Sequence, residues 1–233
     1  MEIRKLHGWR VAFQEAVAIQ RRLKNSLILS DVSLFGEIRT VGGADISYDH
    51  GSGRFFAAAV VLSFPDLHIL EQSSASARVL FPYIPGLLSF REGPPLIAAF
   101  ARLKCRPDIV LFDGQGIAHP RGIGLASHMG LWLDIPSIGC AKKRLTGDYI
   151  EPGLRAGQWS PLHVEEQIVG AVVRTKLRVK PVFVSQGHRV SLERAIRIVL
   201  ACTAGYRLPE PVRLAHLAVN QLRLLHRKSS GRK

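Results

Sequence analysis

Three consecutive strand patterns in the first third of the chain constrain the fold more than any other feature. Segments 38–47, 54–63 and 67–77 are rich in apolar, aromatic and β-branched residues. Only the polar stretch 48–53 and the turn at 65–66 separate them. Because connections this short join neighbouring antiparallel strands, the segments predict a three-stranded antiparallel meander.

The rest of the chain alternates between helical and strand patterns. Two short apolar segments bounded by turns, 108–112 and 136–141, have the composition of buried parallel strands. The remaining predicted elements are helices over 9–23, 92–104, 123–133, 191–203 and 211–227, strands over 167–174 and 181–185, and an irregular stretch over 144–163. A meander followed by alternating helices and parallel strands predicts an α/β fold with a mixed β-sheet flanked by helices. The ribonuclease-H-like architecture has this order, and other α/β topologies fit it as well.

Length and composition predict one soluble domain. A chain of 233 residues with 47% hydrophobic and 21% charged residues can bury a full core. It shows no internal repeat or composition break, so we expect a single domain over 1–233 that ends in a loose basic tail over 226–233. The longest apolar run, 55–62, is too short to span a membrane, and the charged first residues lack a signal core, which favours the cytoplasm. Three widely spaced cysteines predict free thiols rather than disulfides or a zinc site: Cys105, Cys140 and Cys202.

The balance of charge favours a polyanionic partner. Lys and Arg number 32 against 18 Asp and Glu, which gives a formal net charge of +14. A field of this sign attracts nucleic acid, the commonest polyanion of the cytosol. An anionic membrane surface is the alternative, but no long basic amphipathic helix supports it. A high pI can also serve solubility alone.

Three carboxylates fall where an α/β sheet places chemistry. Asp45 lies near the end of the first strand, Asp113 follows the apolar strand 108–112, and Glu92 stands at an expected helix start. Ligands of open α/β sheets gather at the carboxyl ends of strands. One Asp after a strand is more often a turn or a cap, but three converging carboxylates repel one another unless a cation neutralises them. Such oxygen ligands favour Mg²⁺ or Mn²⁺, which can polarise a phosphate and activate a water.

Longer segments of the chain resemble a known family. The segments are GGADISYD (42–49), PYIPGLLSFREGPP (82–95), DGQGIAHPRGIGLASHMGLWLDIPSIGCAKKRLTG (113–147), QGHRVSLE (186–193) and GYRLPEPVRLAH (205–216). In order and spacing they resemble the endonuclease V family over nearly the whole chain. The resemblance implies a ribonuclease-H-like fold. It also implies a DNA repair endonuclease that uses Mg²⁺ or Mn²⁺ to hydrolyse the second phosphodiester bond 3′ to a deoxyinosine.

The resemblance assigns roles to individual residues of the predicted catalytic site. Asp45 and Asp113 would bind the metal directly, and Glu92 would complete the acidic cluster, as a ligand or through water. Lys142 and His216 correspond to positions near the scissile phosphate and the attacking water. These residue types suit those positions, because a Lys can offset phosphate charge and a His can assist proton transfer.

A wedge and a base pocket are implied in the same way. The segment Pro82, Tyr83, Ile84 and Pro85 resembles the loop that enters the duplex where the damaged base leaves. Without the neighbouring motifs, the same four residues would predict only a rigid surface loop. The residues implied around the extruded base are Gly86, Leu88, Gly114, His119 and Gly124. Two residues depart from the family pattern, since many members carry a His in place of Gln115 and an Arg in place of Gly122.

Three hypotheses about function stay open on the sequence. The first is repair of DNA that contains deaminated bases, and the second is cleavage of inosine-containing RNA, which some relatives prefer. The third is a nucleic-acid-binding module of the same fold without catalysis, which predicts that a carboxylate of the cluster is missing, whereas all three are present. No sequence feature indicates an obligate protein partner.

Overall fold

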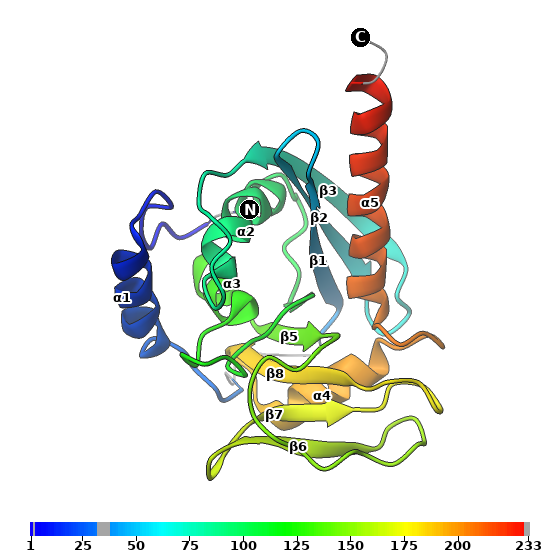
Figure 1. Cartoon of the computed structure of the whole chain (residues 1–233). Helices are drawn as coiled ribbons and strands as arrows, with labels where there is room; N and C mark the ends of the chain where they lie inside the picture. Colours follow the sequence, from blue (N-terminus) through cyan, green and yellow to red (C-terminus); the bar gives the residue numbers. More distant parts are fainter. Residues whose placement is uncertain (2, 32–37, 231–233) are drawn as a thin grey trace.

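An eight-stranded mixed β-sheet with helices on both faces forms the molecule (Figure 1). The structure is a computed structural model that describes residues 1, 3–31 and 38–230. Its elements are α1 (Phe13–Lys24), β1 (Thr40–Asp49), β2 (Arg54–Ser63), β3 (Ile69–Arg78), α2 (Leu88–Ala101), β4 (Ile109–Phe112), α3 (Leu125–Leu133), β5 (Ser137–Ala141), β6 (Trp159–Val164), β7 (Gln167–Val173), β8 (Val182–His188), α4 (Leu192–Ala201) and α5 (Glu210–Ser230). The strand order is β3-β2-β1-β4-β5-β8-β7-β6.

The directions of the strands match the sequence prediction in the first half of the sheet and differ in the second. The antiparallel meander β1-β2-β3 is confirmed, and β4 lies parallel to both β1 and β5 as predicted. The prediction of parallel strands is wrong for β7 and β8, which pair antiparallel with their neighbours, and β6, for which no strand was predicted, is antiparallel as well. No helix separates β6, β7 and β8 in the chain, and a parallel neighbour requires a long crossover connection.

Side chains of the central strands alternate between two cores, one on each face of the sheet. On β4, Ile109 and Leu111 pack with α4 and the start of α5, whereas Val110 and Phe112 pack with α2 and α3. Figure 1 shows the β1–β3 part of the sheet between α2 on one side and α5 on the other. Because successive residues of a strand point to opposite faces, Asp113, which follows Phe112, is directed to the face that α5 covers.

Helix α2 begins earlier than the sequence suggested. The prolines at 94 and 95 predicted a helix that starts at Glu92, whereas α2 starts at Leu88 and contains both prolines in its interior. Phe90, in the first turn, is fully buried in the core cluster that also contains α1. Burial of an aromatic side chain is worth about 1.5–3 kcal/mol, which offsets part of the helical cost of the two prolines, so tertiary packing helps to extend α2 beyond the local signal.

Two further segments differ from the sequence prediction. The stretch 144–163 was expected to be irregular, but β6 begins within it at Trp159. Pro161 obscured this strand; it is tolerated because β6 lies at the edge of the sheet and pairs only with β7. Helix α5 continues to Ser230, so residues 226–230 are helical where a loose tail was expected, and 231–233 lie outside the described residues.

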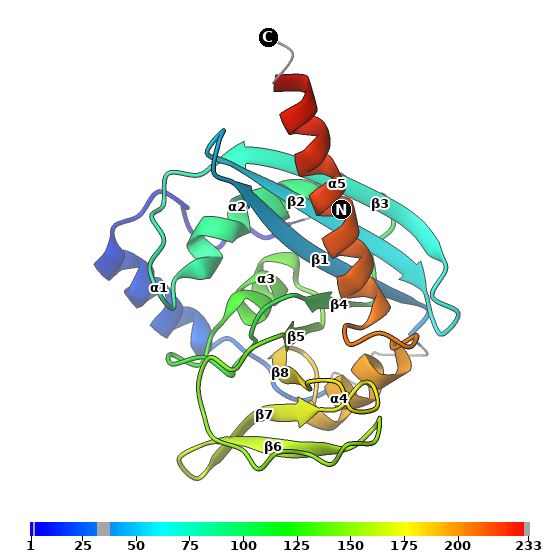
Figure 2. The ribbon, with the colours of Figure 1, turned by 45° about the vertical axis from the view of Figure 1, so that its right-hand side comes forward.

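Helix α5 crosses the outer face of the meander, and its C-terminal end projects beyond the sheet (Figure 2). The chain thus places α5 directly over β1, the strand that carries Asp45. Within the described part of the chain, no helix is both long and apolar enough to cross a membrane. The cysteines Cys105, Cys140 and Cys202 are free thiols, as predicted.

Candidate active site

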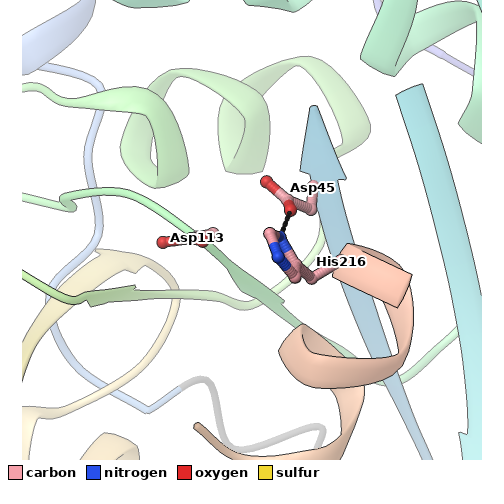
Figure 3. A group of neighbouring side chains, drawn as sticks. All are labelled: Asp45, Asp113 and His216. Atoms are coloured by element: carbon pink, nitrogen blue, oxygen red, sulfur yellow. Dashed lines mark hydrogen bonds and ion pairs between the residues drawn. The ribbon is translucent and has the colours of Figure 1, made fainter. Parts of the chain in front are cut away.

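Two of the predicted carboxylates are positioned by neighbouring parallel strands, Asp45 on β1 and Asp113 directly after β4. Ala44 of β1 is in register with Phe112 of β4, and the Asp113 N–H donates to the Ala44 carbonyl at 3.3 Å. Asp45 and Asp113 therefore sit side by side at the same level of the sheet. With His216 of α5 they form a group whose ligand atoms all lie within 4.8 Å of one another (Figure 3).

The position of His216 depends on the close packing of α5 against β1. The imidazole Nδ1 lies 2.7 Å from Asp45 Oδ2, and Nε2 lies 3.0 Å from the Asn220 amide nitrogen. Because the Asn220 amide nitrogen also donates to the His216 carbonyl, it acts as the donor to Nε2, which leaves Nδ1–H to donate to Asp45. Sequence reasoning named His216 only through the resemblance; the structure shows that a residue far along the chain completes the group.

Negative charge is concentrated around this group. Burial raises the pKa of Asp45, and the nearby Asp113 carboxylate adds to the rise, against the hydrogen bond from His216. Burial, together with the charges of Asp45 and Asp113, raises the pKa of Glu92 to about 8. Glu92 lies on α2, outside the group of three, yet close enough for both aspartates to act on it. Carboxylates this close repel one another unless a cation or a proton offsets their charge.

A lysine balances part of this charge. Lys142 directly follows β5, and its ammonium forms an ion pair with Asp113 Oδ2. Its backbone carbonyl accepts a hydrogen bond of 2.6 Å from Arg207. The Lys142 side chain remains partly exposed, so its charge faces both the carboxylates and the solvent from which a phosphate would approach.

The donor set of the group fits a divalent cation. Two carboxylates, one on β1 and one directly after β4, offer oxygen ligands within the span of one ion, and the imidazole on α5 lies beside them as a donor to Asp45. Carboxylate oxygens suit Mg²⁺ and Mn²⁺. The sequence prediction thus agrees with the geometry for Asp45 and Asp113, while Glu92 stands at a greater distance.

A cavity of about 530 Å³ opens beside Asp113. All the residues that the resemblance placed around an extruded base line it: Gly86, Leu88, Gly114, His119 and Gly124. Tyr83, Ile84 and Pro85 of the wedge segment form another part of its wall, and Lys142 a third. Three segments far apart in the sequence thus meet at one cavity next to the carboxylates.

The residues that depart from the family pattern lie in different places. Gln115 lines the cavity, and its amide nitrogen donates to the Lys143 carbonyl at 3.0 Å. Gly122 lines a smaller neighbouring cavity of about 290 Å³ instead. Only the first of these substitutions is therefore in a position to contact a base in the larger cavity.

His119 lines the cavity, but the protein itself satisfies its ring. Nδ1 accepts the Arg121 N–H at 3.1 Å, and Nε2 donates to the Gly86 carbonyl at 3.0 Å. Burial, with Arg121 as a smaller contribution, lowers the pKa of His119 to about 4. The neutral imidazole therefore ties two loops together.

The wedge segment is exposed. Tyr83 has 68% of its surface accessible, and the Arg91 guanidinium lies 5.9 Å from the centre of its ring. An aromatic side chain in this position is available to stack on a base. Arg91 and Gln20, which also borders the cavity, were missed by sequence reasoning because neither stands out by type or local spacing.

Comparisons with known proteins agree on one family. The family model described as Endonuclease V matches residues 21–217. An endonuclease V of Dehalococcoides mccartyi is 48% identical over 222 residues, which cover 95% of this chain and 99% of that protein. The crystal structure of endonuclease V from Bacillus subtilis superposes with a TM-score of 0.94 at 31% identity and covers 98% of this chain and 100% of that chain.

A third similar protein was solved with nucleic acid. Ciona intestinalis endonuclease V, in complex with a DNA that contains an inosine followed by a ribo-adenosine, has a TM-score of 0.79 and 30% identity, and covers 89% of this chain and 95% of that chain. The structural similarity confirms the α/β, ribonuclease-H-like fold expected from the sequence. The chain belongs to the endonuclease V family.

Proposed function

We propose that this protein is a metal-dependent DNA repair endonuclease that recognises deoxyinosine and hydrolyses the second phosphodiester bond 3′ to it. The observation that carries the proposal is the junction of a cavity large enough to admit a base with the carboxylate group: Gly114, which lines the cavity, directly follows Asp113. The Ciona relative, which was solved with inosine-containing DNA, supports the choice of substrate. The net charge of +14 supports nucleic acid as the partner.

The chain's own residues divide the work of hydrolysis. Asp45 and Asp113 hold Mg²⁺ or Mn²⁺, with Glu92 as a further ligand, directly or through water. When bound, such an ion polarises the phosphate and lowers the pKa of a water. His216 donates Nδ1–H to Asp45 and accepts the Asn220 amide N–H at Nε2, so its imidazole orients the Asp45 carboxylate. Lys142 offers a positive charge to the phosphate at the edge of the site.

The start of α2 offers a way to distinguish hypoxanthine from adenine. The first N–H groups of a helix have no partner within the helix, and no side chain caps α2 at Leu87. Leu88 and Ser89, the first residues of α2, both line the cavity. Their N–H groups suit the carbonyl oxygen of hypoxanthine, whereas adenine presents an amino donor at the same position. Extrusion also costs less for a poorly paired base such as inosine, which adds selectivity.

Cleavage of an end-labelled duplex with one deoxyinosine tests the proposal. We expect a single nick at the second phosphodiester 3′ to the inosine with Mg²⁺ or Mn²⁺, no nick with EDTA, and none with Asp113→Ala. Asp66→Ala is the matched control, because Asp66 is an exposed carboxylate in the turn between β2 and β3. Cleavage that persists in EDTA or in Asp113→Ala would contradict the proposed site.

RNA that contains inosine is the second candidate substrate. Its support is the ribo-adenosine that follows the inosine in the Ciona complex. Matched strands that differ only in deoxyribose or ribose at the cleaved position separate the two candidates. Metal-independent binding without cleavage of either strand would instead indicate a nucleic-acid-binding module.

A further inference from the structure

Three side chains donate hydrogen bonds to the carbonyl of Gly86. Gln20 Nε2 donates to it at 2.9 Å and His119 Nε2 at 3.0 Å, and the Arg121 guanidinium donates to it as well. Gly86 has a φ of +78°, and a Cβ there would lie 2.4 Å from the Arg121 side chain. Only glycine permits this conformation together with so close an approach.

Gln20 is the centre of this arrangement. It lies on α1, only 1% exposed, and its amide nitrogen also lies 3.3 Å from the Ile123 carbonyl. Its Oε1 accepts a hydrogen bond of 2.5 Å from Arg121 Nε. One buried side chain therefore joins three segments: α1, the residue that directly follows the wedge segment, and the loop between β4 and α3. A buried amide with its donors and acceptor engaged rigidifies what it contacts.

Gly86 stands between two functional parts of the chain. It directly follows Pro85, the last residue of the wedge segment, and lies two residues before Leu88, where α2 begins at the cavity wall. A shift of Gly86 would move the wedge segment, which is joined directly to it, whereas the buried side chains of Leu87 and Phe90 hold the first turn of α2 in the core. Misplacement of a functional group by about 1 Å can cost roughly a hundredfold in rate.

We propose that Gln20, with Arg121, is a positioning residue that braces the Gly86 carbonyl, fixing the wedge segment over the cavity so that the base is extruded into it. The proposal rests on the proposed function for the identity of the base. Gln20 acts through Gly86 and does not touch the reacting atoms. The brace explains why a polar side chain is buried in α1, a helix that contributes nothing to the carboxylate group.

Two substitutions of Gln20 test the brace. Gln20→Leu removes all its hydrogen bonds, and Gln20→Glu keeps an acceptor for Arg121 but places a carboxylate against the Gly86 carbonyl. Gln14→Leu is the matched control, because Gln14 is exposed on the same helix. We expect both Gln20 variants to lower kcat/KM on an inosine duplex by about tenfold or more. On an inosine single strand, where no duplex has to be opened, we expect less than a threefold loss.

Base extrusion can be followed separately from cleavage. A 2-aminopurine placed beside the inosine becomes fluorescent when the stack opens, and Ca²⁺ in place of Mg²⁺ slows cleavage during the measurement. We expect the increase in fluorescence on DNA binding to be severalfold smaller in Gln20→Leu than in the parent protein. In a Tyr83→Ala background, the same Gln20→Leu change should have little further effect, because both residues act through the wedge. Equal losses on duplex and single strand, or full additivity with Tyr83→Ala, would indicate a general structural role and overturn the proposal.

A measurement on the free protein keeps the proposal independent of the substrate. Hydrogen exchange of amides in 80–88 should be at least tenfold faster in Gln20→Leu than in the parent or in Gln14→Leu, while amides of β1 and β4 stay unchanged. Unchanged exchange in 80–88 would overturn the brace whatever the enzyme cleaves. If the parent protein does not cut inosine DNA but the exchange result holds, the proposed function fails and the brace stands.

Discussion

The close approach of α5 to β1 at Gly43 predicts that a methyl group added there will displace α5. A Cβ at this position would lie 1.9 Å from the Pro211 carbonyl oxygen, whereas real Cβ atoms are not found below 3.0 Å. The neighbouring atoms are backbone and cannot rotate away. Gly43→Ala therefore requires the start of α5 to move away from β1 by about 1.1 Å, the difference between these two distances.

That movement is transmitted to His216, which lies on the same helix. The His216 Nδ1–Asp45 Oδ2 distance of 2.7 Å would lengthen toward about 3.8 Å, beyond hydrogen-bond range. Because misplacement of this size costs about a hundredfold in rate, we expect a comparable fall in kcat on deoxyinosine DNA. Overpacking of this kind costs about 1–3 kcal/mol of unfolding free energy, so the protein should remain folded at moderate temperature.

Single-turnover cleavage, metal titration and thermal unfolding of Gly43→Ala together check the prediction. The control is Gly42→Ala on the adjacent residue, where a Cβ would meet only side-chain atoms of Pro107 and Val110 at 3.1 Å. We expect the control to cleave within a few-fold of the parent and Gly43→Ala to need more Mn²⁺ for half-maximal activity. Parent-like cleavage and metal dependence in Gly43→Ala would refute the reasoning that α5 must approach β1 this closely.

Three further outcomes are expected. Tyr83→Ala should change the free energy of unfolding by no more than about 0.5 kcal/mol relative to the parent, because Tyr83 is exposed. The same variant should cleave duplex DNA more slowly. An equal loss of cleavage on single strands would contradict a wedge role. Mn²⁺ at a hundredfold excess over its Kd should raise the free energy of unfolding by about 2.7 kcal/mol. This stabilisation should be weaker at low pH, because the raised pKa values of Asp45 and Glu92 let protons compete with the metal. Melting curves check this, with Asp113→Asn as a variant whose melting temperature should not change with Mn²⁺. Burial lowers the pKa of His188 from 6.5 to about 4. As the pH falls from 6.5 to 4, the unfolded chain therefore binds a proton at His188 before the folded protein does, and about 3 kcal/mol of the free energy of unfolding is lost over that window. In His188→Gln, the free energy of unfolding measured with denaturant should depend less steeply on pH. An unchanged slope would exclude His188 as the cause of the pH dependence.

Local patterns in the sequence predicted those parts of the molecule that depend on near neighbours. The meander follows from apolar segments joined by short turns, and the burial of β4 follows from its unbroken apolar run, Ile109–Phe112. Asp113 could be singled out because it ends such a strand. The full set of site residues came from longer blocks of residues that resemble one family, not from periodicity.

Tertiary packing decided what local patterns could not encode. The start of α2 was misplaced because the burial of Phe90 in the core leaves no mark on local spacing, and β6 was missed because a proline is tolerated at a sheet edge. The role of Gln20 was invisible for the same reason: its partner Gly86 lies 66 residues away. The sequence by itself determined which residues can do chemistry. The fold decided which of them meet, because hydrogen bonds and burial between distant segments depend on how strands and helices pack and leave no mark on local spacing.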